Sequence, residues 1–320
     1  MPEYPEIEAL RELLEARVSG QTVARAGPTH LAILKTIDPP LNSLEGATLG
    51  APLRRGKPLL FPVSAADLVL HVHQMSAGRI SVLKLGVTGP KRPAFSLTLE
   101  FGERLVMTEH GSKKRARVGL YRTGALDEGL SHLGPEAYDI TDDALADALG
   151  AESRRLHSFL RDQRALAGIG CAWANQILNR SKLSPYALSG KLGADEVRRL
   201  GVAIRSSLSE GPDARRAGKS DKQVYTVYKR LDETCPTCAA ALAQVDFEEH
   251  TIFYCQPARP TDGCSRIGDY PEFFGSSTTK QSLTMDVVLP RVLSTRRAAA
   301  TPNSRISVPP RTPRAFSWIG

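Results

Sequence analysis

The residues with the most specific chemistry stand at the start of the chain, in Met1-Pro2-Glu3. A small second residue lets cells remove the initiator methionine, so we expect Pro2 to become a secondary-amine N-terminus. An α-amine titrates near pH 8, roughly, so a useful fraction is an unprotonated nucleophile at neutral pH. Its iminium with an aldehyde stays charged at every pH, which suits covalent catalysis on an opened sugar. The alternative is an acidic helix N-terminus, where Pro and Glu are favoured.

A second group of reactive side chains lies in the last third of the chain. Cys235 and Cys238 are separated by two residues, and Cys255 follows after sixteen more. This spacing fits three thiolates of a tetrahedral zinc site, and five cysteines in a reducing compartment favour metal binding over disulfides. Cys264 is the candidate fourth ligand, reached through a longer loop. Cys171 has no metal-binding neighbour in the sequence.

Two further features allow more than one interpretation. His71 and His73 alternate like residues on one face of a strand, but no third ligand is evident, so a structural or DNA-facing role is favoured over a metal pair. Lys57 stands in the basic stretch Arg54-Arg55-Gly56-Lys57, where the ordinary interpretation is a solvated side chain.

Composition bounds the class of protein. The 320 residues leave room for two or three domains, and 41% hydrophobic residues is ordinary for a globular protein. The net charge of +8 and the pI near 9.3 suit a polyanionic partner. No apolar run could span a membrane, and the acidic start lacks the basic region of a signal peptide, so we expect a cytoplasmic protein.

The hydrophobic pattern divides the chain into parts that must position these residues. Apolar spacing predicts a helix from Ile7 to Val18 that ends at Gly20. Between residues 22 and 121, short β-rich pieces broken by Gly and Pro predict an antiparallel β-sandwich. These pieces are Leu59–Val63, Leu68–Val72, Ile80–Leu85, Phe95–Phe101 and Leu105–Thr108.

The rest of the chain is predicted to be mainly helical. Residues 132–136 indicate a linker, and helical patterns run from Asp142 to about Ser209 with a sharp break at residues 166–170. Residues 211–222 are polar and basic, which predicts a mobile segment. After Cys255 the sequence turns to Ser, Thr, Arg and Pro with little periodicity, so poor order is expected there.

The run Pro2-Glu3-Tyr4-Pro5-Glu6-Ile7-Glu8 resembles the N-terminal signature of the formamidopyrimidine-DNA glycosylase and endonuclease VIII family, which repairs oxidised bases. Residues 159–170 with Trp173-Ala174-Asn175 resemble its helix-two-turn-helix module, and residues 224–255 resemble its zinc-finger hairpin. The resemblance covers residues 2–255.

The resemblance implies an α+β multidomain fold. Its parts would be an N-terminal catalytic β-sandwich domain with a flanking helix (1–130), a linker (131–141), a helix-two-turn-helix DNA-binding domain (142–222), a zinc-finger-like hairpin (223–264) and a disordered tail (265–320).

The resemblance also implies catalytic roles. Pro2 would attack C1′ of the damaged nucleotide, and Glu3 would be the acid/base that protonates the sugar ring oxygen. Glu6 would help to position it. Lys57 would hold a flanking phosphate and polarise the leaving base.

DNA-binding roles follow in the same way. Attack at C1′ requires a flipped nucleotide, and Met75 resembles the methionine that fills the void, with an ordinary core methionine as the alternative. The family's aromatic wedge is missing from residues 108–115, where only basic side chains remain as phosphate contacts. Gly168 and Gly170 would let the backbone approach a phosphate. The predicted contacts not yet named are Lys113, Lys114, Arg115, Cys171 (where the family has Asn) and His250 (where it has Arg).

The zinc finger departs from the family pattern. The family places its fourth cysteine where Ala258 stands, which leaves Cys264 as the replacement ligand of one structural zinc ion. We hypothesise that the chain from about Gln256 is read out of frame, since a shifted reading of suitable codons restores a cysteine at the family spacing. The gene's nucleotide sequence tests this hypothesis.

These features predict a bifunctional DNA glycosylase and abasic-site lyase that binds damaged double-stranded DNA as a monomer, in the bacterial cytoplasm at the nucleoid. The preference between 8-oxoguanine and oxidised pyrimidines stays open. The second hypothesis is a damaged-DNA-binding protein with weak or no catalysis, and the third is a generic zinc-ribbon binder of nucleic acid, which does not explain Pro2, Glu3 or Lys57.

Overall fold

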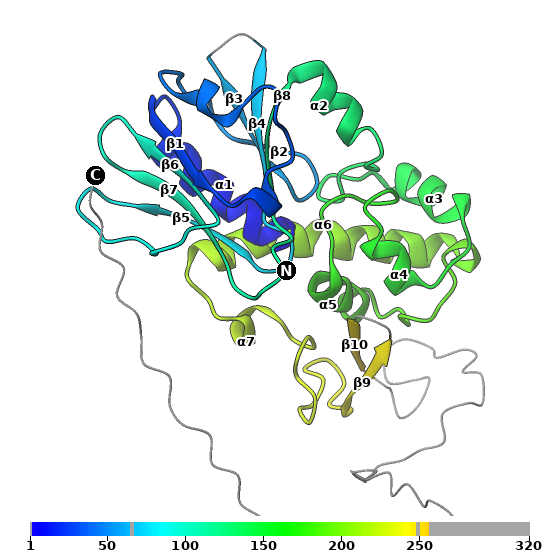
Figure 1. The fold of residues 1–320 in the computed structure, drawn as a ribbon. Coiled ribbons are helices and arrows are strands. Elements are labelled where there is room, and N and C mark those ends of the chain that lie inside the picture. Colours follow the sequence, from blue (N-terminus) through cyan, green and yellow to red (C-terminus); the bar gives the residue numbers. More distant parts are fainter. Residues whose placement is uncertain (1, 65–66, 248–249, 256–320) are drawn as a thin grey trace, which may run out of the picture. The chain divides into compact units, whose positions relative to one another are not determined.

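The computed structural model describes residues 2–64, 67–247 and 250–255 (Figure 1). The predicted ligand Cys264 and the predicted tail, 265–320, lie outside the described residues. No helix among the described residues is long and apolar enough to cross a membrane.

The first half of the chain forms a helix and two antiparallel sheets (Figure 1). The sheets have the strand orders β1-β6-β7-β5 and β2-β3-β4-β8. The elements are α1 (Tyr4–Val18), β1 (Val23–Thr29), η1 (Leu31–Ile33), η2 (Leu41–Leu44), β2 (Leu53–Arg54), β3 (Leu59–Val63), β4 (Leu68–His73), β5 (Gly78–Leu83), β6 (Phe95–Leu99), β7 (Arg104–Glu109) and β8 (Arg117–Arg122).

One hydrophobic core joins the two sheets, which confirms the predicted sandwich. Phe61 and Leu70 of one sheet and Phe95 and Leu97 of the other belong to the same buried cluster, together with Leu14 of α1. The paired strands β3 and β4 turn alternate side chains into this core, as half-buried antiparallel strands do. Two predicted strands end early, since β5 ends at Leu83 and β6 at Leu99.

Helix α1 begins three residues earlier than the apolar pattern predicts, at Tyr4. Glu3 is its N-cap, and the Glu3 amide donates to Glu6 Oε2 at 3.0 Å. This capping box gives a hydrogen-bond acceptor to an amide that would otherwise have none at the helix start. It also fixes the backbone that directly follows Pro2.

The second half is helical down to residue 224. Its elements are α2 (Thr123–Leu130), α3 (Asp142–Ala151), α4 (Leu156–Arg161), α5 (Cys171–Ser181), η3 (Ser189–Lys191), α6 (Ala194–Arg216) and α7 (Asp221–Val224). A second core forms around Phe159, Trp173 and Ile204, and it includes Tyr4 at the start of α1. The two cores therefore meet at the N-terminus.

The segment 211–222, which was predicted to be mobile, is largely helical. Helix α6 continues to Arg216 with Pro212 inside it, and α7 follows at Asp221. Gly211 and Pro212 are buried, and a Cβ on Gly211 would lie 2.7 Å from Pro5 Cβ. Close contact between α6 and α1 overrides the helix-breaking tendency of Gly and Pro, which is a weak local signal.

The predicted linker is a firmly packed segment. Residues Glu136 and Ala167 form a parallel bridge, and the Ala167 amide donates to Pro135 O at 2.9 Å. Gly134 has no room for a side chain, because a Cβ there would lie 2.4 Å from Arg164 O. This segment is therefore part of the site's framework.

The last described element is the hairpin of β9 (Leu242–Phe247) and β10 (His250–Cys255), paired from His250–Phe247 to Cys255–Leu242. It confirms the predicted hairpin. Its small core consists of Val227, Leu242 and two of the cysteines.

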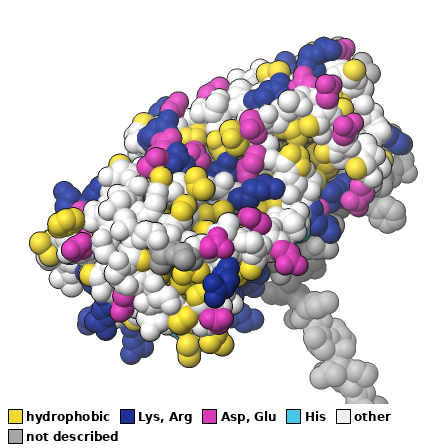
Figure 2. All heavy atoms as spheres, turned by 90° about the horizontal axis from the view of Figure 1, so that it is seen from above, with side chains coloured by type: hydrophobic (Ala, Val, Ile, Leu, Met, Phe, Trp, Pro, Cys, Tyr) yellow, Lys and Arg dark blue, Asp and Glu magenta, His cyan; other side chains and the backbone are white. Residues whose placement is uncertain are grey.

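Charge is interspersed on one face of the molecule. Figure 2 shows Lys and Arg side chains next to Asp and Glu around a central strip of hydrophobic side chains. On this face, among the described residues, positive charge is not gathered into one patch.

Candidate active site

The carboxylate of Glu3 is held by the start of another helix. The Gly170 amide donates to Glu3 Oε2 at 2.6 Å, the Ala172 amide to Oε1 at 2.9 Å and the Trp173 amide to Oε2 at 3.2 Å. Helix α5 begins here, and helix starts offer unpaired amides and a positive dipole. Residues 167 positions or more apart thus meet around one carboxyl group that is only 2% exposed.

Burial sets the proton affinity of this group. It raises the pKa of Glu3, while the Lys57 charge and the amides of Ala172 and Trp173 lower it. A carboxyl group with a raised pKa can hold a proton near neutral pH and donate it, as a general acid must.

Pro2 and Glu3 line a cavity of about 730 Å³, together with Cys171, His250 and residues of the segment 221–229. The cavity has room for a nucleotide-sized ligand. We refer to it as the Pro2 cavity.

Glu6 braces one wall of the Pro2 cavity. Its Oε1 accepts from Trp173 Nε1 at 3.3 Å, from Arg215 Nε at 2.8 Å and from the Tyr225 hydroxyl at 3.1 Å. Its Oε2 accepts from the Glu3 amide. These contacts are what a positioning role, as predicted for Glu6, requires.

Lys57 is not a solvated side chain. It is 6% exposed, and burial lowers its pKa while the charge of Glu3 raises it. The lysine lines a second cavity of about 580 Å³, beside His71, His73 and Met75. The charges of Lys57 and Glu3 influence each other's pKa, although the two residues line different cavities.

The two histidines beside Lys57 are neutral. Burial and the charge of Arg117 lower the pKa of His71 to about 4, and burial with neighbouring positive charge lowers that of His73 to about 3. Neither belongs to a group of metal-ligating side chains among the described residues.

Met75 is half-buried and has φ of +51°. Its amide donates to His73 Nδ1 at 2.9 Å, which stabilises this left-handed turn. It lies in a cavity wall rather than in the core, so the alternative of an ordinary core methionine is wrong, and its void-filling role stays a prediction.

The three predicted basic contacts differ in exposure. Lys113 and Arg115 are exposed. Lys114 is half-buried, and its ammonium donates to the carbonyls of Glu109 and Gly111. Lys114 therefore closes its own loop, while the other two face solvent.

The break before α5 serves Glu3 in this structure. Gly168 has φ of +105°, and its carbonyl accepts from the Tyr4 amide at 3.0 Å. A Cβ on Gly170 would lie 2.5 Å from the Glu3 carboxyl carbon. The amides predicted to face a DNA phosphate donate to Glu3 in this structure. The phosphate-binding role of Gly168 and Gly170 stays a prediction, and a phosphate bound there would share these amides with Glu3.

Cys171 and His250 do come together, around a residue the sequence did not single out. His157 Nε2 lies 3.9 Å from Cys171 Sγ, and the His157 and His250 rings stack at 5.4 Å. Burial, Arg161 and His250 lower the pKa of His157 to about 3, and burial raises that of Cys171.

Three predicted metal ligands converge. The sulfurs of Cys235, Cys238 and Cys255 lie within 4.8 Å of one another. Burial opposes ionisation of Cys235, but amide N–H groups of Thr237 and Cys238, with help from Asn179, lower its pKa to about 7. Three thiolates at this spacing could hold a metal ion, and they would occupy three positions of a tetrahedral zinc site.

Sequence reasoning missed two parts of the site. His157 is a single histidine within a helical pattern, which carries no signal of its own. Glu136 was assigned to a linker, although its carboxylate contacts the turn that carries Lys57. Its position directly after Gly-Pro gave no indication of this contact.

Comparisons with known proteins agree on one family. Residues 1–118 match the formamidopyrimidine-DNA glycosylase N-terminal domain. The chain is 28% identical to the formamidopyrimidine-DNA glycosylase of Chloroflexus aggregans over 271 residues, which cover 80% of this chain and 97% of that protein. It is 29% identical to that of Teredinibacter turnerae over 276 residues, with 80% and 98% covered.

Solved structures share the fold. The formamidopyrimidine-DNA glycosylase of Lactococcus lactis, non-covalently bound to DNA with an abasic site, superposes with a TM-score of 0.72 at 22% identity. The match covers 79% of this chain and 97% of that one. A complex of the Lactococcus lactis protein with DNA that contains an oxidised pyrimidine matches with the same TM-score and identity.

Proposed function

Since the chain belongs to the formamidopyrimidine-DNA glycosylase family, we propose that it excises oxidised bases from DNA and then cleaves the strand as an abasic-site lyase. The observation that carries this proposal is the buried Glu3 carboxyl group next to Pro2, in one cavity and coupled to Lys57. A DNA-repair role of this kind implies damaged double-stranded DNA as the partner, with the protein acting as a monomer at the nucleoid.

The proposed first step forms a bond between the Pro2 nitrogen and C1′. The base leaves with the electron pair of its glycosidic bond and takes up the proton that the Pro2 nitrogen loses after forming the new bond. Protonated Glu3 then gives its proton to the ring oxygen, the C1′–O bond breaks, and the Pro2 nitrogen and C1′ share an iminium. The iminium withdraws electrons from the sugar.

Strand cleavage follows from this electron withdrawal. Loss of a C2′ proton and of the 3′ phosphate is the β-elimination, and loss of the C4′ proton and of the 5′ phosphate is the δ-elimination. Water then releases Pro2. Lys57, as a buried cation, would stabilise negative charge on a flanking phosphate or the departing base.

Zinc would have a structural part only. Cys235, Cys238 and Cys255 would hold the ion together with a fourth donor, and the ion would supply folding free energy to the hairpin. No step of the reaction passes through it.

The test is a panel of duplexes with 8-oxoguanine, oxidised pyrimidines or an abasic site, assayed with and without borohydride. The proposal predicts that the wild-type protein cleaves the abasic duplex and forms a borohydride-reduced covalent adduct with it. It predicts that Lys57→Ala neither cleaves the base-containing duplexes nor forms an adduct with them. Cleavage of no duplex and no adduct would refute it.

The second candidate is a damaged-DNA-binding protein with weak or no catalysis. It is favoured by the departures at Cys171 and His250, two weak phosphate donors that line the same cavity and both contact His157. The same panel separates the two, since a binding protein retains the lesion duplex without an adduct. Both predict binding that weakens steeply with added salt.

A further inference from the structure

The turn between β2 and β3 carries Lys57, and its shape depends on two residues before the lysine. Gly56 has φ of +61°, a conformation that favours glycine. Arg54 Nη1 donates to Gly56 O at 2.8 Å and so bridges the turn. Lys57 directly follows this glycine, so the orientation of the Gly56 peptide sets where the lysine begins.

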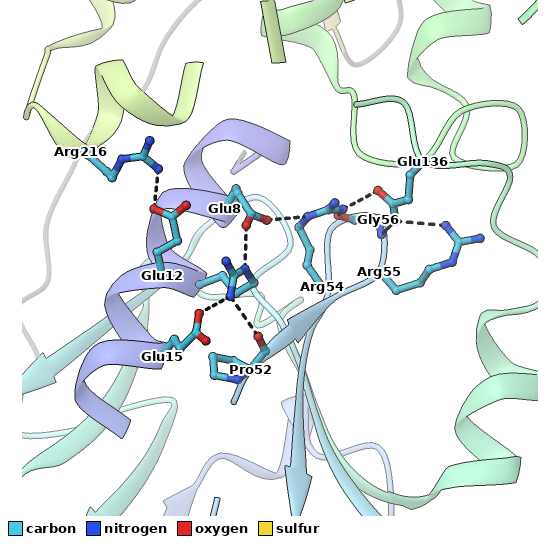
Figure 3. Close-up of polar contacts among 10 residues, drawn as sticks. Glu8, Glu12, Glu15, Pro52, Arg54, Arg55, Gly56, Glu136 and Arg216 are labelled. Atoms are coloured by element: carbon cyan, nitrogen blue, oxygen red, sulfur yellow. Dashed lines mark hydrogen bonds and ion pairs between the residues drawn. The ribbon is translucent and has the colours of Figure 1, made fainter. Parts of the chain in front are cut away.

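The carboxylate of Glu136 holds this turn from outside the sandwich (Figure 3). The Gly56 amide donates to Glu136 Oε1 at 2.6 Å, Arg55 Nη1 donates to the same oxygen at 3.2 Å, and Arg54 Nη1 donates to Oε2 at 2.5 Å. One carboxylate therefore contacts three consecutive residues before Lys57, one of them through the main chain.

Arg54 is buried and fixed on all sides. Its guanidinium lies 4.3 Å from the ring centre of Tyr4 and 5.3 Å from that of Tyr138, and its Nε donates to Glu8 at 3.1 Å. Its side chain is only 5% exposed. A buried arginine between two carboxylates and two rings is a rigid group, because removal of one partner would leave its charge uncompensated.

Glu136 is itself tied to the segment that precedes α5. It bridges to Ala167, the Ala137 amide donates to Ala167 O at 3.1 Å, and Gly168 begins the turn that leads to the amides holding Glu3. Glu136 is thus bonded on one side to the Lys57 turn and on the other to the support of Glu3. Arg55 adds bonds from the turn to Leu133 O and Gly134 O.

We propose that Glu136 is a positioning residue that fixes the turn carrying Lys57 by binding the Gly56 peptide and both arginines of the turn. The expected effect of Glu136 on the rate of base release rests on the proposed function. The contact of Glu136 with the Lys57 turn does not depend on any reaction. Misplacement of a catalytic group by about 1 Å reduces rates by up to roughly 100-fold.

Two variants and a control test the proposal. Glu136→Ala removes all three contacts, whereas Glu136→Gln keeps an acceptor for the Gly56 amide. Glu210→Ala is the control, because Glu210 is an exposed carboxylate that pairs with Arg180 at 2.7 Å, away from the Lys57 turn. Thermal unfolding of each variant verifies that it is folded before assay.

The first measurement does not need activity. Reductive methylation of the native protein, read by peptide mass spectrometry, measures how accessible the Lys57 amine is. We expect the Lys57 labelling rate to rise several-fold in Glu136→Ala, less in Glu136→Gln and not at all in Glu210→Ala. Equal Lys57 labelling in wild type and Glu136→Ala would overturn the proposal.

The second measurement is the single-turnover rate of base release in a double-mutant cycle with Lys57→Ala. We expect a 10- to 100-fold loss for Glu136→Ala in the wild-type background and less than a 3-fold change in the Lys57→Ala background. Equal losses in both backgrounds would mean a merely structural role and would overturn the proposal. A wild-type protein without activity would refute the proposed function, and the labelling experiment would still decide the contact.

Discussion

Ionisable side chains gather at two sites, around Glu3 and around Cys235. The two sites differ in what holds these side chains in place. Glu3 receives three amide hydrogen bonds, Lys57 is buried, and Glu6 is bonded to Trp173, Arg215 and Tyr225. The cysteine cluster offers three sulfurs around an otherwise small core. The first site is organised by folding alone, whereas the second, under the proposed zinc role, would depend on a bound metal ion.

The comparison teaches which site tolerates change. A buried carboxyl group that accepts three amide hydrogen bonds is strongly specified, because its loss leaves buried donors without a partner. A metal-held hairpin depends on the metal instead. A substitution at one site should therefore leave the other site intact. Four experiments test this independence and the contacts on which it depends.

The largest effect is expected from Glu3→Gln. The amide group of glutamine cannot donate a proton as an acid, and its NH₂ would face the donors of the α5 start. We expect the single-turnover rate of base release to fall by roughly 10²- to 10⁴-fold, with zinc content unchanged. Glu12→Gln on the same helix is the control, and a rate for Glu3→Gln within threefold of wild type would contradict the role of Glu3.

Cys255→Ser should break the other site alone. We expect about one zinc ion per wild-type chain and none in the variant, by elemental analysis of purified protein. Hydrogen exchange should lose protection in β9 and β10 but retain it in β3 and β4. Cys171→Ser is the matched control, and zinc content unaffected by Cys255→Ser would exclude the three-cysteine cluster as the metal site.

Gly211→Ala tests the contact that supports the start of α1. The new methyl group would lie 2.7 Å from Pro5 Cβ and 2.8 Å from the Trp173 ring, so overpacking should lower the free energy of unfolding by about 1–3 kcal/mol. Gly150→Ala in α3 is the control, since nothing lies within 4 Å of its added Cβ, and it should stabilise by up to about 1 kcal/mol. Chemical denaturation measures both, and equal shifts would contradict the close contact.

The smallest effect concerns pH. Burial lowers the pKa of His157 to about 3 in the folded protein, against about 6.5 when unfolded, so the unfolded state binds the proton more tightly. The stability contributed above pH 6.5 or so is lost progressively as the pH falls, by about 1 kcal/mol between pH 7 and 5.5 for this residue. His157→Gln should flatten the pH dependence of unfolding by that amount, with His110→Gln as control. An unchanged slope would show that His157 takes up its proton equally well in the folded and unfolded states, which contradicts a lowered pKa.

Sequence reasoning succeeded where the signal is local. The alternation of apolar residues located β3 and β4 closely, and the Cys-x-x-Cys spacing located the sulfur cluster. The catalytic roles of Pro2, Glu3 and Lys57 come from the family resemblance and stay predictions, although the structure shows Glu3 and Lys57 to be buried. The family resemblance added their register along the chain.

Sequence reasoning failed where contacts between distant segments determine the local structure. Gly211-Pro212 signals a helix end, yet tight contact with Pro5 continues the helix. The amides that hold Glu3 lie 167 and more residues away, and Glu136 reaches the Lys57 turn across 80 residues. No local pattern encodes such pairs, because each partner has an ordinary local environment.

The central claim is that the nitrogen of Pro2 forms a covalent bond with deoxyribose. Its most direct test is peptide mass spectrometry of the protein reduced with borohydride on an abasic-site duplex. We expect the sugar-derived mass on the N-terminal peptide at Pro2, and no adduct when one extra residue is placed before Pro2 to convert its amine into an amide. An adduct on a lysine instead, or undiminished trapping by the extended protein, would contradict the account.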